Sequence, residues 1–269
     1  ADVAQWVDWG VDFLKYDWCP TDARSLERMG RQVRTAARDI VLSICTSARL
    51  TEIDAHKTWA HMWRGIPDTR DVWSIVLTNG FMSDDYVQED WRPHIGPGGW
   101  HDLDMFALGP QFATADSSCP NRLTTDEQIT HMTAWALYPS PLILSCDLSA
   151  LSDFELRLFG NDEVIAVNQD RLGKPAIRLS EERSQSLDSR QPQRNARIWA
   201  RPLADGSFAA GLFNLADGPD ELSLDLRSLG LTGSVAVRNL WERRDLGRVQ
   251  GRFTIAVPAH GAQMIRLRR

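Results

Sequence analysis

The sequence lacks the features that mark membrane proteins and nucleotide-binding proteins. No apolar run in its 269 residues approaches the roughly 20 residues of a membrane-spanning helix, so we expect no membrane partner. It contains neither a P-loop nor a G-x-G-x-x-G fingerprint, the two common phosphate-binding loops. Its formal net charge of −6 argues against nucleic acid as a partner.

Cysteine is also scarce, and its spacing gives no sign of a metal site. The four cysteines are Cys19, Cys45, Cys119 and Cys146, and no two of them form a C-x-x-C pair. We expect no metal and no organic cofactor, and disulfide bonds are permitted but not required. The chain begins ADVAQWVDWG, without Met, a basic start or an apolar signal core, so we expect an N-terminal segment to be missing upstream.

The first two-thirds of the chain alternates short apolar runs with helical patterns. Strands are predicted over Val11–Tyr16, Ile40–Cys45, His61–Arg64, Gly99–Met105 and Pro141–Ser145. Helices are predicted over Thr21–Arg38, Asp71–Gly80 and Leu123–Tyr138, the last with two overlapping capping boxes at its start. The first strand is mostly apolar and is expected to be buried on both faces. This alternation predicts parallel β/α units over residues 1–174.

The pattern changes near Lys174, where short alternating runs separated by turn signals begin. Seven strands are predicted, over Ala176–Leu179, Ala196–Ala200, Ser207–Phe213, Glu221–Leu226, Ser234–Arg238, Arg252–Val257 and Ala262–Leu267. They predict an antiparallel β-sandwich domain over residues 175–269. About five β/α units precede it, but a closed barrel needs eight. The first part is therefore an open α/β sheet or a barrel whose first strands are missing.

Charged residues gather where the predicted parallel strands end. The strand ends carry Lys15 and Asp17, then Cys45 and Thr46, then Arg64 with Asp68, and finally Asp102 with Asp104. In parallel β/α folds such ends converge on one mouth. Two carboxylates and a cation there suit glycoside hydrolysis, in which one carboxylate attacks the anomeric carbon and the other protonates the leaving oxygen.

Structural roles compete with these catalytic ones. Asp17 and Lys15 would also make an ion pair at the rim of a sheet. Asp68 follows a proline and precedes a helix, so it would also serve as an N-cap. Asp102 and Asp104 alternate on one strand and so point the same way, and at least one of them is expected to support its neighbours through hydrogen bonds.

Five motifs, in order, resemble those of glycoside hydrolase family 27, the α-galactosidases and α-N-acetylgalactosaminidases. The matches are Lys15–Cys19 to K-Y-D-N-C, Trp63–Trp73 to W-R-x-x-x-D-I-x-D-x-W, Pro97–Met105 to P-G-G-W-N-D-P-D-M, Ser140–Ile143 to S-P-L-I, and Glu163–Asp170 to E-V-I-A-V-N-Q-D. The resemblance implies a (β/α)8 TIM-barrel whose first three β/α units are missing here, followed by a C-terminal antiparallel β-sandwich.

The same resemblance implies roles for individual residues. Asp17 would be the nucleophile and Asp68 the general acid/base. The residues implied to contact substrate are Lys15, Cys19, Thr46, Arg64, Asp104 and Met105. The family retains anomeric configuration, which implies carboxyl groups roughly 5–5.5 Å apart. It also implies a disulfide partner for Cys19 upstream of this chain, and a secreted or periplasmic location.

These resemblances predict a retaining hydrolase that releases terminal α-linked galactose from oligosaccharides or glycoconjugates. Departures from the family pattern keep alternatives open. The galactosidase pattern C-E-W is replaced by Cys45-Thr46-Ser47, and the small Thr46 favours an α-N-acetylgalactosaminidase. Another α-glycosidase, acting on α-glucans or arabinopyranosides, is a further alternative. A non-catalytic carbohydrate-binding remnant is also an alternative, because the early barrel strands are missing. Trp18 stands where the family has Asn.

Overall fold

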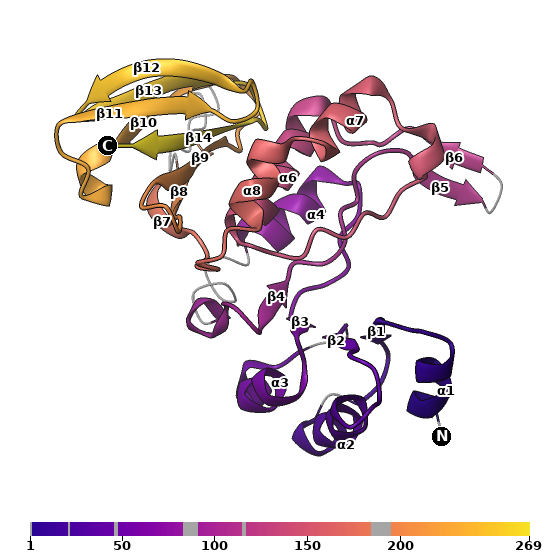
Figure 1. The fold of residues 1–269 in the computed structure, drawn as a ribbon. Coiled ribbons are helices and arrows are strands. Elements are labelled where there is room, and N and C mark those ends of the chain that lie inside the picture. The colour runs from indigo at the N-terminus through magenta and orange to yellow at the C-terminus, as the bar shows by residue number, and fades with distance from the viewer. Residues whose placement is uncertain (1, 21, 46–47, 83–90, 115–116, 184–194) are drawn as a thin grey trace.

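The structure is a computed structural model that describes residues 2–20, 22–45, 48–82, 91–114, 117–183 and 195–269. Figure 1 shows three regions in chain order. Short strands with flanking helices form the N-terminal region, a group of helices follows, and a strand-rich region holds the C-terminus.

The N-terminal region is built on a four-stranded parallel sheet. Its strands are β1 (Phe13–Tyr16), β2 (Val41–Ile44), β3 (Met62–Arg64) and β4 (Trp100–Asp102), in the order β1-β2-β3-β4. Helices α2 (Ala23–Arg34) and α3 (Ile53–Trp59) contribute to the core on one side of this sheet, where Leu26, Leu42 and Trp63 are fully buried. Four of the five predicted parallel strands are therefore confirmed, and the eight-stranded barrel stays a prediction.

The expectation that the first strand is buried on both faces is wrong. Phe13 is 44% exposed and Lys15 is exposed, whereas Tyr16 is buried. The reason is position, because β1 is the edge strand of its sheet and pairs only with β2 among the described residues. Its two faces differ, and only the face that carries Tyr16 lies in the core.

Further helices and short elements flank the parallel strands and connect them to the C-terminal sheets. The α-helices are α1 (Asp2–Asp8), α4 (Trp73–Leu77), α6 (Thr125–Leu137), α7 (Asp153–Phe159) and α8 (Asp162–Asn168). Single turns form η1 (Leu50–Glu52), η2 (Thr78–Met82), η4 (Arg92–His94) and η5 (Leu148–Ala150), and a hairpin is made by β5 (Gln111–Thr114) and β6 (Ser117–Cys119). The hairpin projects away from the sheets in Figure 1.

Two predictions in this stretch need correction. The helix expected over Asp71–Gly80 is only the short α4, followed by the π-helical turn η2. The strand expected over Pro141–Ser145 is reduced to one parallel bridge between Phe106 and Leu144. By contrast, the capping box at the start of α6 is confirmed, because Thr124 and Glu127 bond reciprocally.

The C-terminal region consists of two antiparallel sheets. Strands β7 (Ile177–Arg183), β8 (Asn195–Pro202), β9 (Phe208–Asn214), β11 (Ser234–Asn239), β12 (Arg244–Gln250) and β14 (Ala262–Arg268) form one sheet, and β10 (Asp220–Asp225) pairs with β13 (Arg252–Val257) in the other. The turn η6 (Leu226–Leu229) follows β10. Side chains of both sheets share one buried cluster. All seven predicted strands are confirmed, and β12 was missed.

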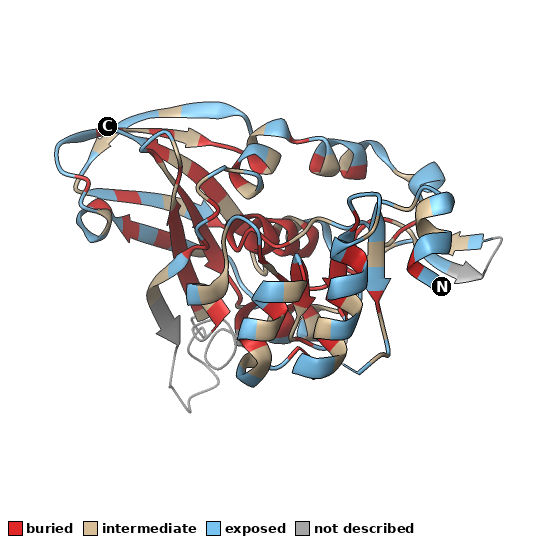
Figure 2. Cartoon of the chain, turned by 60° about the horizontal axis from the view of Figure 1, so that its bottom comes forward, coloured by how far each residue is buried: buried red, intermediate tan, exposed pale blue. Residues whose placement is uncertain are grey.

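Helix α6 joins the C-terminal sheets to the rest of the protein. Its Trp135 and Leu137 share a buried cluster with Trp199, Phe213 and Met264 of strands β8, β9 and β14. Figure 2 shows buried residues concentrated in the central helices and adjoining strands, with exposed outer surfaces. Because this core continues across residue 174, the division into domains at that point stays a prediction.

Candidate active site

The register of the parallel sheet aligns the carboxyl ends of its four strands. Tyr16 is opposite Ile44, Ile44 is opposite Trp63, and Trp63 is opposite His101. The next residue on each strand is therefore in one row, and that row is Asp17, Cys45, Arg64 and Asp102. Because these residues are equivalent in register, their side chains leave the same face of the sheet. The register thus aligns these four strand ends, and their convergence on one substrate site stays a prediction.

Arg64 is the centre of this row. Its Nη1 lies 2.7 Å from Oδ1 of Asp68 and 2.8 Å from Oδ1 of Asp104, and its Nε donates to the carbonyl of Cys45 at 2.8 Å. Burial works to lower the pKa of Arg64, but the charge of Asp104 and the hydrogen bond to Asp68 outweigh it and raise that pKa. Arg64 therefore stays charged and holds two carboxylates beside the end of β3.

Asp104 is fixed from several sides. The strand predicted to reach Met105 ends at Asp102, and Asp104 lies beyond it in a left-handed conformation with φ 67°. Its Oδ2 accepts a hydrogen bond of 2.6 Å from the backbone N–H of Thr69. Its backbone carbonyl accepts one of 2.9 Å from Nε1 of Trp135 on α6. Such a conformation is unfavourable for a residue with a Cβ and persists only where its surroundings hold it.

Asp102 is a buried carboxyl group next to Asp104. Its Oδ1 accepts a hydrogen bond of 2.9 Å from the backbone N–H of Asp104. Burial, together with the nearby negative charge of Asp104, raises the pKa of Asp102 to about 6. Asp102 therefore supports the conformation of its neighbour and changes protonation state near neutral pH.

Asp17 and Lys15 lie at the other side of the row. Nζ of Lys15 is 3.5 Å from Oδ2 of Asp17, and the two side chains are 54% and 36% exposed. Burial works to lower the pKa of Lys15, yet contacts with Cys45 and Asp17 raise it. Burial raises the pKa of the Cys45 thiol, which stays neutral there. The predicted ion pair exists, but at this exposure it stabilises the fold little and leaves the carboxylate accessible.

Asp68 is the most accessible carboxylate of the cluster, with 61% of its side chain exposed. The N-cap role considered for it is wrong, because α4 begins after Val72. The side chain is instead directed by Arg64, the last residue of the strand β3 that precedes Asp68 in the chain. The separation of roughly 5–5.5 Å between the Asp17 and Asp68 carboxyl groups stays a prediction.

The remaining expected substrate residues have mixed outcomes. Cys19 is half-buried, and its Sγ donates to the carbonyl of Asp17 at 3.1 Å. Met105 is half-buried and directly follows Asp104. Thr46 lies outside the described residues. Cys19, Cys45, Cys119 and Cys146 are all free thiols, and an upstream disulfide partner for Cys19 stays a prediction.

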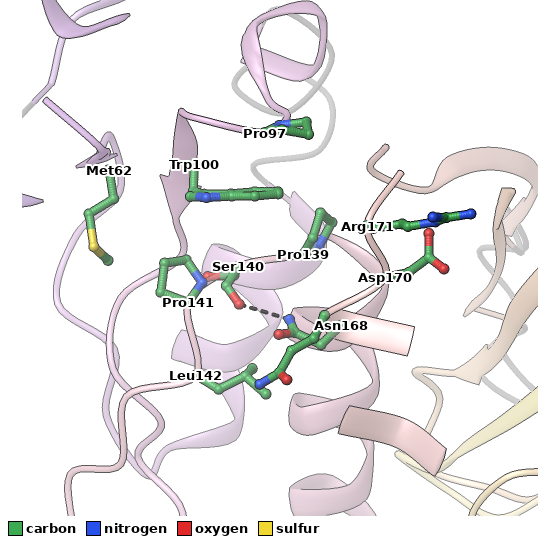
Figure 3. A pocket seen from close by; sticks show the side chains of 11 residues that line it. Met62, Pro97, Trp100, Pro139, Ser140, Pro141, Leu142, Asn168, Asp170 and Arg171 are labelled. Atoms are coloured by element: carbon green, nitrogen blue, oxygen red, sulfur yellow. Dashed lines mark hydrogen bonds between the residues drawn. The ribbon is translucent and has the colours of Figure 1, made fainter. Parts of the chain in front are cut away.

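A separate cavity of about 560 Å³ lies at the opposite end of the strands. It is lined by Met62 and Trp100, at the amino ends of β3 and β4, together with Pro139, Pro141 and Asn168. Figure 3 shows the Trp100 ring beside this opening, with a hydrogen bond from Asn168 to the carbonyl of Ser140. No pattern in the sequence predicts this cavity, and none of the charged strand ends lines it.

No group of three or more His, Cys, Asp or Glu within the described ranges could hold a metal ion. None of the helices in the same ranges is long and apolar enough to cross a membrane.

Comparison with known families accounts for most of the chain. The family model described as "Alpha galactosidase A" matches residues 1–170, and the model described as "Alpha galactosidase C-terminal beta sandwich domain" matches residues 193–267.

Individual proteins match along almost the whole chain. An α-galactosidase of Oryza sativa subsp. japonica is 30% identical over 98% of this chain and 58% of its own length. One of Cyamopsis tetragonoloba is 29% identical over 98% of this chain and 59% of its own. The crystal structure of a GH27 β-L-arabinopyranosidase from Geobacillus stearothermophilus is 27% identical and superposes with a TM-score of 0.85, covering 99% of this chain and 60% of the other. The chain thus spans less than two-thirds of the length of these proteins.

Proposed function

We propose a function for this chain, which belongs to glycoside hydrolase family 27, the α-galactosidase family. It carries the catalytic residues of a retaining glycosidase that releases terminal α-linked galactose. One observation supports this most directly. Arg64, at the end of β3, binds both Asp68 and Asp104. Asp17 follows the end of β1 in the same sheet, and its side chain is partly accessible to solvent.

Each residue takes a role that its surroundings permit. Asp17 attacks the anomeric carbon, while the carboxyl group of Asp68 protonates the leaving oxygen. Asp68 then removes a proton from the water that releases the sugar from Asp17. Lys15, 3.5 Å from Asp17, favours the ionised form of the nucleophile.

The buried end of the cluster is suited to binding sugar hydroxyls. The side chains of Asp104 and Arg64 are only 6% and 11% exposed, and their charges are mutually compensated. A hydroxyl group there can donate to a carboxylate and accept from the guanidinium. We assign Cys19, Thr46 and Met105 to the wall of the same sugar site.

We also propose the architecture in which this site operates. Residues 1–174, which contain the four parallel strands, form part of a (β/α)8-type barrel, and residues 175–269 form the sandwich domain. The open, linear strand order, with β1 at its edge, is compatible with further strands beside it.

A second candidate activity is hydrolysis of β-L-arabinopyranosides. It is supported by the TM-score of 0.85 with an enzyme of that activity. The two sugars have the same ring stereochemistry, and galactose carries an additional hydroxymethyl group. A pocket that binds one therefore differs from a pocket for the other in the space left at that group.

The test is hydrolysis of a panel of 4-nitrophenyl glycosides by this chain, namely α-galactoside, α-N-acetylgalactosaminide, α-glucoside and β-L-arabinopyranoside. Proton NMR of the first-formed sugar anomer reports whether configuration is retained. Asp17→Asn should lower turnover by at least about 10³-fold while circular dichroism stays unchanged. The matched control is Asp12→Asn, an exposed carboxylate paired with Arg38 just before the same strand, which should leave turnover unchanged.

Preferential cleavage of the α-galactoside supports the main proposal, and preferential cleavage of the arabinoside supports the second. Full activity of Asp17→Asn would remove Asp17 from the mechanism. Sugar binding without hydrolysis by the wild-type chain would favour the carbohydrate-binding alternative.

A further inference from the structure

The proposed general acid Asp68 lies in a short segment of irregular backbone between β3 and α4. The residues of this segment alternate in burial. Thr69 and Asp71 are only 0% and 6% exposed, whereas Asp68 and Arg70 are exposed. This alternation is that of an extended chain, which turns successive side chains to opposite sides. The contacts of the buried side chains therefore decide where Asp68 is held.

Two of these buried residues are anchored to neighbouring loops. The backbone N–H of Thr69 donates to Asp104, and its Oγ1 accepts a hydrogen bond of 2.9 Å from Nδ2 of Asn79. Oδ2 of Asp71 accepts from the backbone N–H and from Nε of Arg122, at 3.1 Å and 3.0 Å. Arg122 lies just before α6, so the start of that helix holds the middle of the segment.

A third anchor comes from the C-terminal sheets. Trp73, the first residue of α4, stacks on the imidazole of His260, with ring centroids 4.6 Å apart and 23° between the ring planes. His260 lies in the turn between β13 and β14. Its Nδ1 is 2.8 Å from Oε1 of Glu127 on α6, and its Nε2 is 2.9 Å from Oδ1 of Asp217. Hydrogen bonds at both ring nitrogens fix the plane of the imidazole against the indole.

The turn that carries His260 is fixed by its own backbone contacts. The carbonyl of His260 accepts a hydrogen bond of 2.7 Å from Oγ1 of Thr130 on α6, and its N–H donates to the carbonyl of Ala216 at 3.2 Å. His260 has φ 54°, a left-handed conformation that few residues with a Cβ adopt and that persists where such contacts hold it. The C-terminal sheets therefore present the imidazole to Trp73 from a fixed position.

We infer that His260 is a positioning residue for the general acid, because it holds Trp73 and thereby the segment on which Asp68 lies. This inference rests on the proposed glycosidase function. In that function the leaving group is on the side of Asp68, opposite the nucleophile Asp17. Without the imidazole, the segment keeps its other two anchors but loses the one next to α4. A small displacement of an acid lowers the rate of proton transfer without unfolding the protein.

The kinetic test compares His260→Asn with the wild-type chain on two substrates. Asn removes the aromatic ring and tolerates a left-handed backbone. For methyl α-galactoside, whose leaving oxygen needs a proton, we expect kcat/KM to fall about tenfold. For 2,4-dinitrophenyl α-galactoside, whose leaving group needs none, we expect a change of less than about twofold. In a Trp73→Leu background the same substitution should add no further loss, because the stacked contact is already gone.

Two further variants accompany this comparison. Thr254→Ala, which removes an exposed hydrogen bond to Ser223 in the same β13–β14 hairpin, is the control and should leave both substrates unaffected. Asp217→Ala removes one partner of the imidazole at a fully exposed side chain, so it tests the inference even if His260→Asn does not fold. It should cause a smaller loss, confined to methyl α-galactoside. Equal losses on both substrates, or no loss on either, would overturn the inference.

Amide hydrogen exchange separates failure of this inference from failure of the proposed function. Mass spectrometry of peptides that cover residues 69–77 should show exchange about tenfold faster in His260→Asn than in wild type, and unchanged exchange in Thr254→Ala. If the wild-type chain hydrolyses neither substrate but this difference is present, only the proposed function fails. Exchange that His260→Asn leaves unchanged would contradict the positioning role, whatever the chain hydrolyses.

Discussion

Nη1 of Arg64 lies 2.8 Å from Oδ1 of Asp104, and the two side chains are only 11% and 6% exposed. The pair joins the end of β3 to the segment that follows β4, where Asp104 is held in a left-handed conformation. It is both a structural contact and the most buried part of the proposed sugar site. Its removal should therefore affect stability and turnover together.

Arg64→Met is expected to destabilise the protein by about 3–5 kcal/mol, because Asp104 would be left as a buried charge without its cation. The measurement is the free energy of unfolding in urea. The matched control is Arg31→Met, which breaks an exposed pair with Glu27 on α2 and should cost no more than about 0.5 kcal/mol. Equal effects of the two substitutions would contradict a structural role for the Arg64–Asp104 pair.

Asp68→Ala should slow hydrolysis in a way that depends on the leaving group. A general acid is needed most when the leaving oxygen is basic, so methyl α-galactoside should lose about 10²–10⁴-fold in kcat/KM. A 2,4-dinitrophenyl α-galactoside, whose leaving group needs no proton, should lose far less in its first step. Added azide should restore turnover of the activated substrate by replacing the water that Asp68 activates. A uniform loss on both substrates would assign Asp68 to binding.

Asp102 should make stability depend on pH in a defined direction. Its pKa is raised to about 6 from the ordinary 3.8, mainly by burial. The folded state therefore favours the protonated form of Asp102. The contribution of this form to the free energy of unfolding is fully present below about pH 4 and is lost as pH rises through 6. Asp102→Asn stays neutral and keeps an acceptor for the N–H of Asp104.

Between pH 4 and pH 7.5, the stability of Asp102→Asn relative to wild type should rise by up to about 3 kcal/mol. Urea unfolding at several pH values measures this change. Substitution of the exposed Asp39 by Asn is the matched control for the loss of one carboxylate. A constant difference between Asp102→Asn and wild type across this range would show that Asp102 does not titrate there.

The fold was predictable where periodicity and caps agree. The seven alternating strands of the C-terminal region and the capping box of α6 are visible in the sequence, and the structure has them. Strand β12 was missed because its sequence, RDLGRVQ, is mainly polar and mostly exposed, so it has no apolar alternation. The burial of β1 was mispredicted because exposure of an edge strand depends on its neighbours, which local sequence does not specify.

The row of charged strand ends was predictable because parallel strands in register place equivalent residues together. The separate contacts made by Arg64 were not predictable in this way. Asp104 reaches Arg64 through a left-handed turn after the strand, and Thr69 completes its partners from a different loop. Such contacts depend on tertiary packing, which no spacing rule encodes.

His131 should destabilise the protein on the acid side of neutrality. It is fully buried between Phe106 and Trp135, neither ring nitrogen has a hydrogen-bond partner among the described residues, and burial lowers its pKa to about 3. Because this pKa is lowered, the folded state favours the neutral imidazole of His131. The contribution of the neutral form to the free energy of unfolding is present above pH 6.5 and is lost as pH falls toward 3. At pH 5 the loss relative to pH 8 should be about 2 kcal/mol.

His131→Phe keeps an aromatic ring in this position and cannot titrate. It should remove that part of the pH dependence, as measured by thermal or urea unfolding between pH 5 and pH 8. His94→Gln, at a half-buried position in η4, serves as the matched control for the loss of one histidine. An unchanged slope in His131→Phe would refute the assignment.

Gly211 of β9 tests whether the C-terminal sheets support the active site through α6. A Cβ at Gly211 would lie 2.5 Å from Cδ1 of Leu137 on α6 and 2.8 Å from the ring of Phe213, so Gly211→Ala forces these buried side chains to shift. We expect a loss of about 1–3 kcal/mol. The control is Gly218→Ala, where a Cβ would meet nothing within 4 Å.

Because Trp135 of α6 also holds the carbonyl of Asp104 at 2.9 Å, Gly211→Ala should lower kcat for the α-galactoside at temperatures well below unfolding. Reduced stability with unchanged kcat would show that the sheets stabilise the fold without positioning Asp104.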